Sequence, residues 1–569
     1  MNLNLKGKAD HTYDAIVVGS GISGGWAAKE LCQKGLKTLV LERGRDVKHV
    51  VDYTTTNSAP WQLSHQNKPT REMLEEQSVQ NRTGYTVTPA NRQFFVNDKE
   101  HPYIEEKRFD WMRGYHTGGR SLMWGKQSYR LSPIDMEANA KDGIAIPWPI
   151  KYADLAPWYD YVEKFAGISG SLEGLDILPD GIFQPPMPFT PAELDFKKAV
   201  ETKWPGRKVI PGRAAHLTAP TAEQTALGRS SCLYRNLCMR GCPFGAYFSS
   251  QAATLKAASL TGNMTLRPHS IVHSVIFDDE TNKAVGVRLI DELTLETTEY
   301  FAKIIFLNAS TVASTSILMN SKSKRFPEGM DESGSLGRNL MDHHLGVGAR
   351  GVLDTHADKI TYGRRPNGFY IPRFRNHSEK ANQNYLRGYG YQGSGLRQNW
   401  TREIDGFGED FKKELTSFGP WSIGMGGFGE CLPYHDNRIY LHPDKKDKWG
   451  LPLVVADAAF RENEINMRLD MRKDAVEMLE AMGAKNITSS NDTPSIGLGI
   501  HEMGTARMGD SPKNSVLNPH NQVWGAPNVF CTDGSAMTSA GCQNPSLTYM
   551  ALTARAADHA VSEMKKGNL

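Results

Sequence analysis

Residues 13–44 read YDAIVVGSGISGGWAAKELCQKGLKTLVLERG and hold every part of a dinucleotide-binding unit. A short apolar strand at 15–18 leads into a G-x-G-x-x-G turn, and a stretch of helical composition follows at 26–34. In such a turn the first glycine permits a tight bend, the second lets the backbone approach a pyrophosphate, and the third allows the helix to pack on the strand. The exposed N–H groups at the helix start then face the phosphates. We therefore assign the following residues to nucleotide binding: Gly19, Gly21, Ile22, Ser23 and Gly24.

A second predicted strand, at 36–41, ends on Glu42. A carboxylate at this position accepts hydrogen bonds from ribose hydroxyls and repels a 2′-phosphate, which favours FAD or NAD over NADP. A glycine-rich turn alone is a weak signal, because ordinary strand–turn–helix units also contain one. Here both strands, the helix and Glu42 are in register, so we assign Glu42 and the adjacent Arg43 to the same site.

The bulk properties exclude several classes of function. The chain has 569 residues, of which 39% are hydrophobic and 23% charged, with a formal net charge of +3. These values are typical of a globular protein with several domains. The chain has no long basic run of the kind that would indicate a nucleic-acid partner. It also has no stretch that approaches the roughly 18 apolar residues of a membrane span. The segment MNLNLKGKADH at 1–11 has neither an apolar signal core nor a twin-arginine pair, so we expect any export to depend on a partner.

Hydrophobic patterning predicts further elements along the chain. Residues 148–168 and 461–482 have helical spacing, and 264–291 read as strand, turn and strand with the turn at 279–282. The segment 536–564 combines a glycine-containing loop with a long helix, and the lysines that follow it suit the negative end of the helix dipole.

Five separated segments together resemble the glucose-methanol-choline (GMC) oxidoreductase superfamily nearly end to end. They are the N-terminal unit, GGRSLMWG at 118–125, SLGRNLMDHH at 335–344, GIHEMGTARMG at 499–509, and FCTDGSAMTSAGCQNPSLTYMALTARAADH at 530–559. Their joint occurrence in this order is very specific. The resemblance implies FAD and the oxidation of an alcohol to a carbonyl.

The resemblance also implies an α/β fold with two interleaved domains. A Rossmann-like FAD-binding domain is assembled from distant segments, and a substrate-binding domain is built on an antiparallel sheet flanked by helices. We predict the FAD-binding domain at 10–150, 215–345 and 495–569, with the cysteine loop 228–250 inserted. We predict the substrate-binding domain at 151–214 and 346–494.

The chemistry of the reaction points to a histidine. Removing a hydride from a C–OH carbon requires a base for the hydroxyl proton while flavin N5 takes the hydride, and imidazole has a suitable ordinary pKa of about 6.5. His501 is the candidate base, and by resemblance its partner is Asn544, which can hydrogen-bond the same substrate oxygen. Pro545 restricts the backbone of Asn544 to extended geometry. Taken singly, a core histidine and a turn residue before proline are the simpler interpretations; together, inside two family motifs, they favour catalysis.

The loop GGRSLMWG bears on how the flavin is held. Some relatives carry a histidine here that bonds to the flavin, whereas this chain has Met123, a poor candidate for such a link. We therefore predict non-covalent FAD, although His116 keeps the alternative open. Asp533, in the TDGS turn, contacts the ribityl or pyrophosphate region by resemblance, and is otherwise an ordinary Asx turn. The residues assigned to the cofactor in these segments are Gly118, Gly119, Ser121, Met123, Asp533, Asn544 and Pro545.

The run SCLYRNLCMRGCPFGA at 231–246 places Cys232, Cys238 and Cys242 in a C-x5-C-x3-C spacing. A disulfide would leave one thiol over, and zinc would need a fourth ligand that the loop does not offer. A three-iron cluster needs only three cysteines. The run resembles that of catalytic subunits of bacterial FAD-dependent glucose dehydrogenases, which implies a [3Fe-4S] cluster that passes electrons from the flavin to a cytochrome. We interpret the remaining cysteines as buried small apolar residues: Cys32, Cys431, Cys531 and Cys542.

A one-electron relay favours a dehydrogenase over an oxidase, because an oxidase passes its electrons directly to O₂. Bacterial relatives with this layout act in the periplasm, beside a small subunit whose twin-arginine signal exports the folded catalytic chain, and a c-type cytochrome is the expected acceptor. We therefore expect a periplasmic protein, with the cytoplasm as the alternative.

The segments YHTGGRSLMWGKQSYRLS at 115–132 and WPIKYADLAPWYDYVEKFAGISG at 148–170 are most similar to bacterial glucoside 3-dehydrogenases. This resemblance implies oxidation of the C3 hydroxyl of glucosides and disaccharides to 3-keto sugars. The alternatives are a glucose, gluconate, sorbitol or fructose dehydrogenase of the same layout, or a non-catalytic flavin and iron–sulfur redox sensor. Side chains at 385–421 that could stack on a sugar, or equally pack in a core, are Tyr385, Tyr389, Tyr391, Trp400, Phe407, Phe418 and Trp421. Those that could hydrogen-bond hydroxyls are Gln392, Arg397 and Asn399.

Overall fold

The N-terminal unit forms strand β1 (Thr12–Val18), helix α2 (Ile22–Gln33) and strand β2 (Thr38–Leu41), as predicted. The computed structural model describes residues 11–83, 86–361, 363, 367–377, 383–398, 402 and 404–569. The apolar ends of β1 and β2 are fully buried, as expected of strands inside a sheet that is covered on both faces.

Both strands belong to an eight-stranded sheet whose centre is parallel. β1 pairs in parallel with β2 and β10, β2 pairs with β7, and β10 pairs with β19. Strands β8, β9 and β18 are antiparallel additions, and the predicted turn at 279–282 connects β8 to β9. The remaining strands of this sheet are β7 (Met264–Arg267), β8 (Ser270–Asp278), β9 (Lys283–Asp291), β10 (Thr297–Leu307), β18 (Gln522–Val523) and β19 (Ala526–Cys531).

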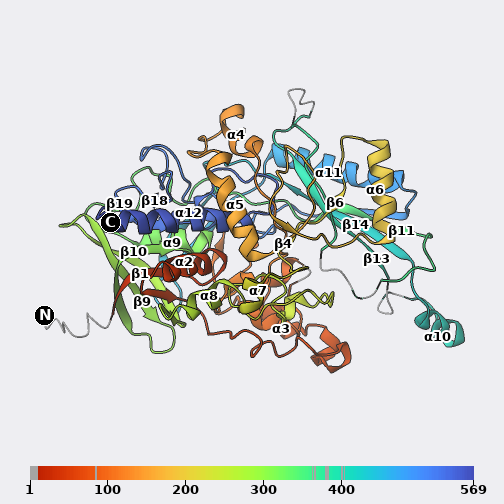
Figure 1. The fold of residues 1–569 in the computed structure, drawn as a ribbon, viewed down its shortest axis with the longest axis horizontal. Helices are drawn as coiled ribbons and strands as arrows, with labels where there is room; N and C mark the ends of the chain where they lie inside the picture. The colour runs from red at the N-terminus through yellow and green to blue at the C-terminus, as the bar shows by residue number, and fades with distance from the viewer. Residues whose placement is uncertain are drawn as a thin grey trace.

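Helices cover this sheet, and small side chains let them approach closely. The long C-terminal helix α12 (Ser546–Lys565) lies beside α2, where alanines of both helices share one buried cluster with β1 and β10 (Figure 1). Helix α8 (Thr254–Leu260) packs against α2, and α9 (Thr311–Asn320) packs against β8. Lys565 stands in the last turn of α12, as the dipole argument predicts.

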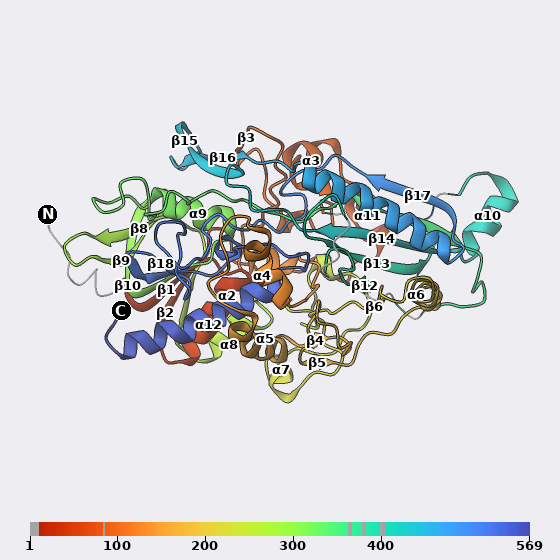
Figure 2. The same ribbon diagram turned by 90° about the horizontal axis from the view of Figure 1, so that it is seen from above.

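The second main sheet has six antiparallel strands in the order β17-β11-β14-β13-β12-β6. Helices α11 and α6 contribute side chains to one buried cluster with this sheet, and Figure 2 shows α11 running along it. The antiparallel sheet flanked by helices is therefore confirmed. Its elements are β6 (Ile210–Pro211), β11 (Val347–Leu353), β12 (Phe369–Ile371), β13 (Tyr389–Arg397), β14 (Trp421–Gly429), β17 (Lys485–Asn491), α6 (Pro191–Lys203) and α11 (Glu462–Ala481).

The two faces of this sheet differ sharply. Along β14 every second residue is buried, beginning with Trp421, and these side chains join Met467 and Met471 of α11 in the core. Tyr385, Tyr389, Tyr391 and Trp421 are core residues, so core packing is the correct interpretation for them. Phe407 and Phe418 are 92% and 66% exposed. Trp400 and Asn399 lie outside the described residues.

Two segments assigned to the substrate-binding domain contact the other half of the chain. Helix α5 (Tyr152–Ala166) packs against α12, with the Tyr159 hydroxyl 2.8 Å from Thr548 Oγ1. Strands β15 (Arg438–Lys446) and β16 (Pro452–Asp457) form a small sheet with β3 (Ile104–Glu105). The predicted domain boundaries stay a prediction, with contacts that cross them at these two places.

The other helices and strands connect these parts. They are α3 (Arg71–Glu76), α4 (Pro133–Asp142), α7 (Ala222–Ala226), α10 (Gly408–Thr416), β4 (Ile168–Ser169), β5 (Phe183–Gln184), and the 3₁₀ turns η1 (Pro60–Gln62), η2 (Ser64–Asn67), η3 (Gln80–Thr83), η4 (Arg92–Phe94), η5 (Gly119–Leu122), η6 (Cys238–Arg240) and η7 (Gly534–Ala536). Within the described chain, none of the helices combines the length and the apolar character needed to cross a membrane.

Candidate active site

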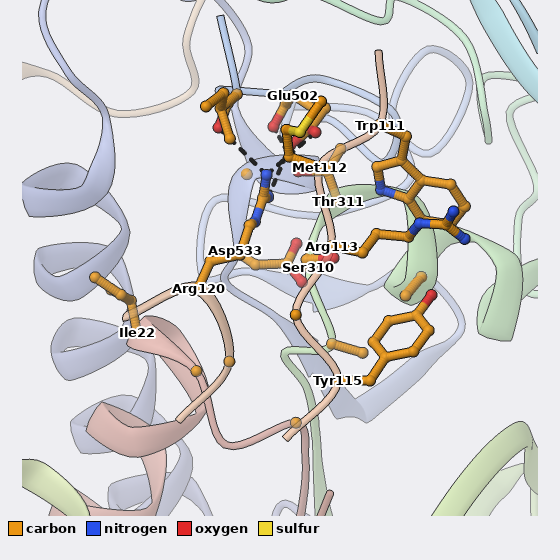
Figure 3. Close-up of a pocket in the computed structure, with 18 of the residues that line it drawn as sticks. Ile22, Trp111, Met112, Arg113, Tyr115, Arg120, Ser310, Thr311, Glu502 and Asp533 are labelled. Carbon is orange, nitrogen blue, oxygen red and sulfur yellow. Dashed lines mark hydrogen bonds and ion pairs between the residues drawn. The ribbon is translucent and has the colours of Figure 1, made fainter. Parts of the chain in front are cut away.

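A cavity of about 590 Å³ lies where four parallel strands end. Gly19, Glu42, Asn308 and Asp533 follow the strands β1, β2, β10 and β19 at or near their carboxyl ends, and all four line the cavity. Ligands of open α/β sheets bind outside the carboxyl ends of the strands, and the volume falls in the range of about 300–1,000 Å³ that is usual for small-molecule sites. Figure 3 shows the cavity with side chains that border it.

The glycines of the first turn have the mechanical roles that their spacing predicts. Gly19 has φ +93°, and a Cβ there would lie 2.3 Å from the carbonyl oxygen of Asn308. A Cβ on Gly24 would lie 1.9 Å from the Gly19 carbonyl oxygen, so only glycine lets the helix approach the strand. At Gly21 nothing lies closer than 4.0 Å, which leaves the backbone open to a ligand.

The start of α2 fits an anionic group. No side chain caps its N-terminus, and Gly21, Ile22 and Ser23 there line the cavity. The first N–H groups of a helix lack partners inside the helix and carry the positive end of its dipole. These groups are therefore placed to receive a pyrophosphate.

Glu42 and Arg43 border the same cavity from the end of β2. The Glu42 carboxylate accepts hydrogen bonds from the Ser20 hydroxyl at 2.5 Å and the Gly44 N–H at 3.1 Å, and burial raises its pKa to about 7. The Arg43 guanidinium lies over the Tyr115 ring, 4.6 Å from its centroid. Both residues are therefore fixed by the surrounding fold before any ligand binds.

The residues predicted to lie near the flavin divide into cavity lining and support. Gly118, with φ +84°, does not border the cavity and instead donates its N–H to Ser20 Oγ at 2.9 Å. The Asp533 carboxylate accepts from the hydroxyls of Ser314 and Ser535 at 2.6 and 2.7 Å while bordering the cavity. The predicted cofactor residues that line the cavity are Gly19, Gly21, Ile22, Ser23, Glu42, Arg43, Gly119, Ser121, Met123, Asp533 and Asn544, and those that do not are Gly24, Gly118 and Pro545.

His116, the alternative site of flavin attachment, is buried and does not border the cavity. Its ring lies 2.9 Å from the Thr117 carbonyl oxygen through Nδ1, and burial lowers its pKa to about 4. Met123 borders the cavity instead. The arrangement agrees with non-covalent binding, which stays a prediction.

His501 borders the cavity, and its ring contacts a second histidine. His501 Nδ1 is 2.8 Å from Nδ1 of His343, whose Nε2 is 2.9 Å from the carbonyl oxygen of Gly541. A carbonyl oxygen only accepts, so His343 Nε2 carries the hydrogen, and a neutral ring leaves His343 Nδ1 as an acceptor. Burial lowers the pKa of His343 to about 4, which keeps that ring neutral near pH 7. His501 must then donate from Nδ1, and its Nε2 is left with a free lone pair.

The protonation state of His501 also suits a base. Burial, and then the neighbouring His343 and Arg120, hold the pKa of His501 well below 6.5. The imidazole is therefore uncharged near neutral pH and ready to accept a proton at Nε2.

Asp342 fixes the loop that carries His501. Its carboxylate accepts from the backbone N–H groups of Gly497 at 2.7 Å, Gly499 at 2.9 Å and His501 at 2.9 Å. The segments also pair as strands do, since Met341 and Met503 exchange backbone hydrogen bonds at 3.0 and 2.9 Å. Burial raises the pKa of Asp342 to about 7. Two segments far apart in the sequence thus hold the imidazole in one position.

Asn544 lies at the cavity directly before α12. Its Oδ1 accepts from Gln392 Nε2 of β13 at 2.5 Å, so its own amide nitrogen is free to donate toward the cavity. The N-terminus of α12 has no side-chain cap, and Ser546 and Tyr549 of its first turn also border the cavity. A helix N-terminus favours negative charge, so this wall suits an oxygen that gains charge during a reaction.

The residue that follows His501 forms an ion pair. Arg120 donates to the Glu502 carboxylate at 2.7 Å, and Figure 3 shows it reaching across the cavity wall toward that residue. Glu502 is 2% exposed, and the Thr311 hydroxyl donates to its backbone oxygen. The ion pair therefore holds the chain directly after His501, as Asp342 holds the chain before it.

The residues present fit FAD. Two uncapped helix N-termini, of α2 and α12, face one cavity that begins at the dinucleotide turn. Asn308 Nδ2 and the Tyr549 hydroxyl are buried at its wall without a hydrogen-bond partner among the described residues. Buried polar atoms usually have partners, so these two groups indicate a polar ligand.

The three loop cysteines are free thiols that lie partly buried. Cys238 borders the cavity, with its Sγ 3.6 Å from His216 Nε2. Burial and the nearby Cys238 and Cys242 raise the pKa of Cys232 to about 11. As the side chains stand, no three His, Cys, Asp or Glu residues of the described chain form a metal-holding group, so no reaction step is assigned to a cluster. The other four cysteines are buried, as predicted.

The sequence reasoning missed two residues of this site, Asp342 and His343, and gave no position to a third, Gln392. His343 and Asp342 lie in SLGRNLMDHH, a segment that supported the family resemblance but to whose residues we assigned no role. The signal that could have identified them is the Asp-His-His run between apolar residues. Gln392 was named as a candidate without a place, and β13 brings it to Asn544. Arg397, named with it, donates to the backbone oxygens of Gly419 and Ala357 instead.

Known proteins are similar to this chain in sequence and in fold. Family models described as GMC oxidoreductase match residues 13–345 and 433–553. The chain is 29% identical over 570 residues to a 2-methyl-1,2-propanediol dehydrogenase of Mycolicibacterium austroafricanum, covering 97% of this chain and 95% of that one. It is 25% identical to the fructose dehydrogenase large subunit of Gluconobacter japonicus, covering 97% and 98%. A crystal structure of formate oxidase aligns with a TM-score of 0.62 at 13% identity, covering 98% and 99%, and shows the same fold.

Proposed function

The chain belongs to the GMC oxidoreductase family, and on this premise we propose that it is an FAD-dependent dehydrogenase of sugar hydroxyl groups. The proposed reaction is oxidation of the C3 hydroxyl of glucosides or disaccharides to a 3-keto sugar. The observation that carries the proposal is the pairing of two groups at one cavity, the free lone pair of His501 Nε2 and the donating amide of Asn544.

FAD, when bound, supplies the acceptor for the hydride that leaves the carbinol carbon. His501 Nε2 takes the proton of the substrate hydroxyl, and the Nδ1–H bond to His343 holds the ring in the accepting tautomer. Asn544 Nδ2 donates to the same oxygen, and the N-terminus of α12 stabilises the negative charge that develops there. The proton and the electron pair therefore leave the substrate to different acceptors.

The sugar assignment is supported by two similarities in sequence. It depends on the resemblance of 115–132 and 148–170 to glucoside 3-dehydrogenases, and on a relative named as a fructose dehydrogenase large subunit. Fructose is accordingly the second candidate substrate. Gln392 and Asn544 supply the amide groups that a hydroxyl-bearing ring needs at the cavity wall.

We also propose an electron route and a location. A [3Fe-4S] cluster at Cys232, Cys238 and Cys242 would serve a cytochrome-type acceptor, and a small subunit with a twin-arginine signal would export the complex to the periplasm. The support is the cysteine spacing, the position of Cys238 at the cavity wall, and a relative named as a large subunit. Iron analysis and electron paramagnetic resonance of the oxidised protein test the cluster. A silent spectrum with no bound iron would remove it from the proposal.

The experiment that tests the function is product analysis. The purified protein, loaded with FAD, is incubated with methyl α-glucoside, glucose or fructose and an artificial electron acceptor, and the product is examined by NMR. A carbonyl at C3 of the glucoside is the expected result. Reaction with none of the three sugars would contradict the sugar assignment, and a protein that never binds FAD would contradict the whole proposal, including the redox-sensor alternative.

A further inference from the structure

The six-stranded sheet carries a second hollow, of about 370 Å³, on the face opposite α6 and α11. Its floor comes from alternate residues of three strands, so the side chains that point into it are those that the helix-covered core does not use. They are Arg350 of β11, Gln392, Ser394 and Leu396 of β13, and Ser422 of β14, together with Gly424 and Gly426.

The hollow and the active-site cavity share one lining residue. Gln392 lines both, and its amide is the group that holds Asn544. The strand register pairs Gln392 with Gly426 and Leu396 with Ser422, so the hollow extends along β13 away from Asn544. Four residues of a strand span roughly 13 Å. A substrate that reacts at His501 and is longer than one ring would continue along this floor.

Packing does not require a glycine at position 426 on the floor of the hollow. A Cβ on Gly426 would meet only the Val347 carbonyl oxygen, at 3.8 Å, and its φ is not in the left-handed region. The neighbour Gly427 is different, because a Cβ there would lie 2.5 Å from Met471 Sδ in the core. The fold would therefore accept a side chain at 426, and its absence keeps the floor open beside Gln392.

The hollow has the chemistry of a polyhydroxyl ligand. Ser394 and Ser422 supply hydroxyls, and the Ser422 hydroxyl donates to the Leu396 carbonyl at 3.3 Å, which leaves its oxygen able to accept. Arg350 is exposed, and only its Nε is engaged, by Thr488 Oγ1 at 3.3 Å, with no carboxylate partner in the described parts of the chain. No carboxylate and no aromatic ring is among the described lining residues.

We propose that this hollow binds the second glycosyl unit of a disaccharide whose first unit reacts at His501. The inference rests on the proposed function, because it requires a sugar ring at His501. Arg350 and Ser394 hydrogen-bond the hydroxyls of the second ring, and the bare backbone at Gly424 and Gly426 lets that ring lie close to the sheet.

The test compares maltose with methyl α-glucoside, which share the reacting ring. In Gly426→Val the added side chain fills the start of the hollow, and kcat/KM for maltose is expected to fall about tenfold, the size of effect that lost pocket contacts give. The value for methyl α-glucoside stays within about twofold, and so does the flavin content. Gly206→Val is the matched control, since a Cβ there meets nothing and the residue borders neither cavity.

A second variant keeps the proposal testable if Gly426→Val folds poorly. Arg350→Met keeps an unbranched side chain but removes the guanidinium donors, and the KM for maltose should rise while kcat and both constants for methyl α-glucoside stay unchanged. Equal effects on the two sugars, or none on either, would overturn the second subsite. If the wild-type protein oxidised neither sugar, the proposed function would fail; calorimetric titration of maltose into wild type and Gly426→Val would then decide the subsite, with equal affinities counting against it.

Discussion

The two sheets of this protein contribute to the site in different ways. The eight-stranded sheet borders the cavity mainly at the carboxyl ends of its parallel strands, through Gly19, Glu42, Asn308 and Asp533. The six-stranded sheet acts along one face, where Gln392 reaches Asn544 from the middle of a strand. The first sheet binds through short loops of fixed spacing, and the second through alternate residues of strands, so the two should respond differently to substitution.

Of the substitutions around the eight-stranded sheet, Gly24→Ala in helix α2 should have the largest effect on FAD binding. The new Cβ would lie 1.9 Å from the Gly19 carbonyl oxygen, so the helix must move away from the strand and its N–H groups leave the pyrophosphate position. We expect loss of FAD, measured as the ratio of absorbance at flavin and protein wavelengths. Gly426→Val on the six-stranded sheet, where the Cβ meets only the Val347 carbonyl oxygen at 3.8 Å, is the control and should retain FAD. Equal flavin content in both variants would contradict the assignment of FAD binding to the eight-stranded sheet.

His343→Leu should lower kcat by about 10²-fold, since part of the 10²–10⁴-fold contribution of a positioned base depends on its tautomer. The substitution leaves the His501 Nδ1–H and the Gly541 oxygen without a partner. His343→Gln can donate to one and accept from the other, so it should recover most of the activity. Stopped-flow kinetics with matched flavin content separates this effect from unfolding. If His343→Gln were as slow as His343→Leu, the result would argue against the assigned tautomer of His501.

Gln392→Leu should lower kcat about tenfold, the equivalent of one neutral hydrogen bond of about 1.4 kcal/mol. The residue belongs to the six-stranded sheet, and without it the Asn544 amide is free to turn. FAD content should not change, because the eight-stranded sheet is untouched. Steady-state kinetics and flavin absorbance measure the two outcomes. Loss of FAD in this variant would show that the two sheets are not separable in function.

The pH dependence should show the smallest change. Burial holds the pKa of His501 well below 6.5, so the base stays unprotonated as the pH falls through 6.5 and loses activity only on passing through the lowered pKa. We therefore expect protonation of His501 to cause no fall in kcat/KM between about pH 6 and pH 7.5, where a histidine with an ordinary pKa of about 6.5 would lose half its activity at pH 6.5. Glu42 and Asp342, whose pKa burial raises to about 7, are the groups at the site that titrate in this range. A half-maximal value near pH 6.5 would contradict the environment assigned to His501.

The same contrast between the sheets explains what the sequence predicted. The dinucleotide turn and the loops after the parallel strands were readable because each needs fixed glycines and a carboxylate at set distances, and the family resemblance drawn from them is confirmed. The antiparallel sheet and α11 were also correctly expected. The contact of Gln392 with Asn544 depends on strand register, and the contact of His343 with His501 on a pairing between segments 158 residues apart. The Asp-His-His run marks His343 but not the residue it contacts, and nothing in the sequence places Gln392 beside Asn544, so both contacts were missed.

In the proposed mechanism His501 accepts the hydroxyl proton while the sugar reduces the bound cofactor. The most direct test mixes methyl α-glucoside anaerobically with FAD-loaded wild type and with His501→Ala, and follows the flavin absorbance. We expect rapid bleaching of the wild type, and a rate about 10³-fold lower in the variant at equal flavin content. Bleaching of His501→Ala at the wild-type rate would contradict the mechanism.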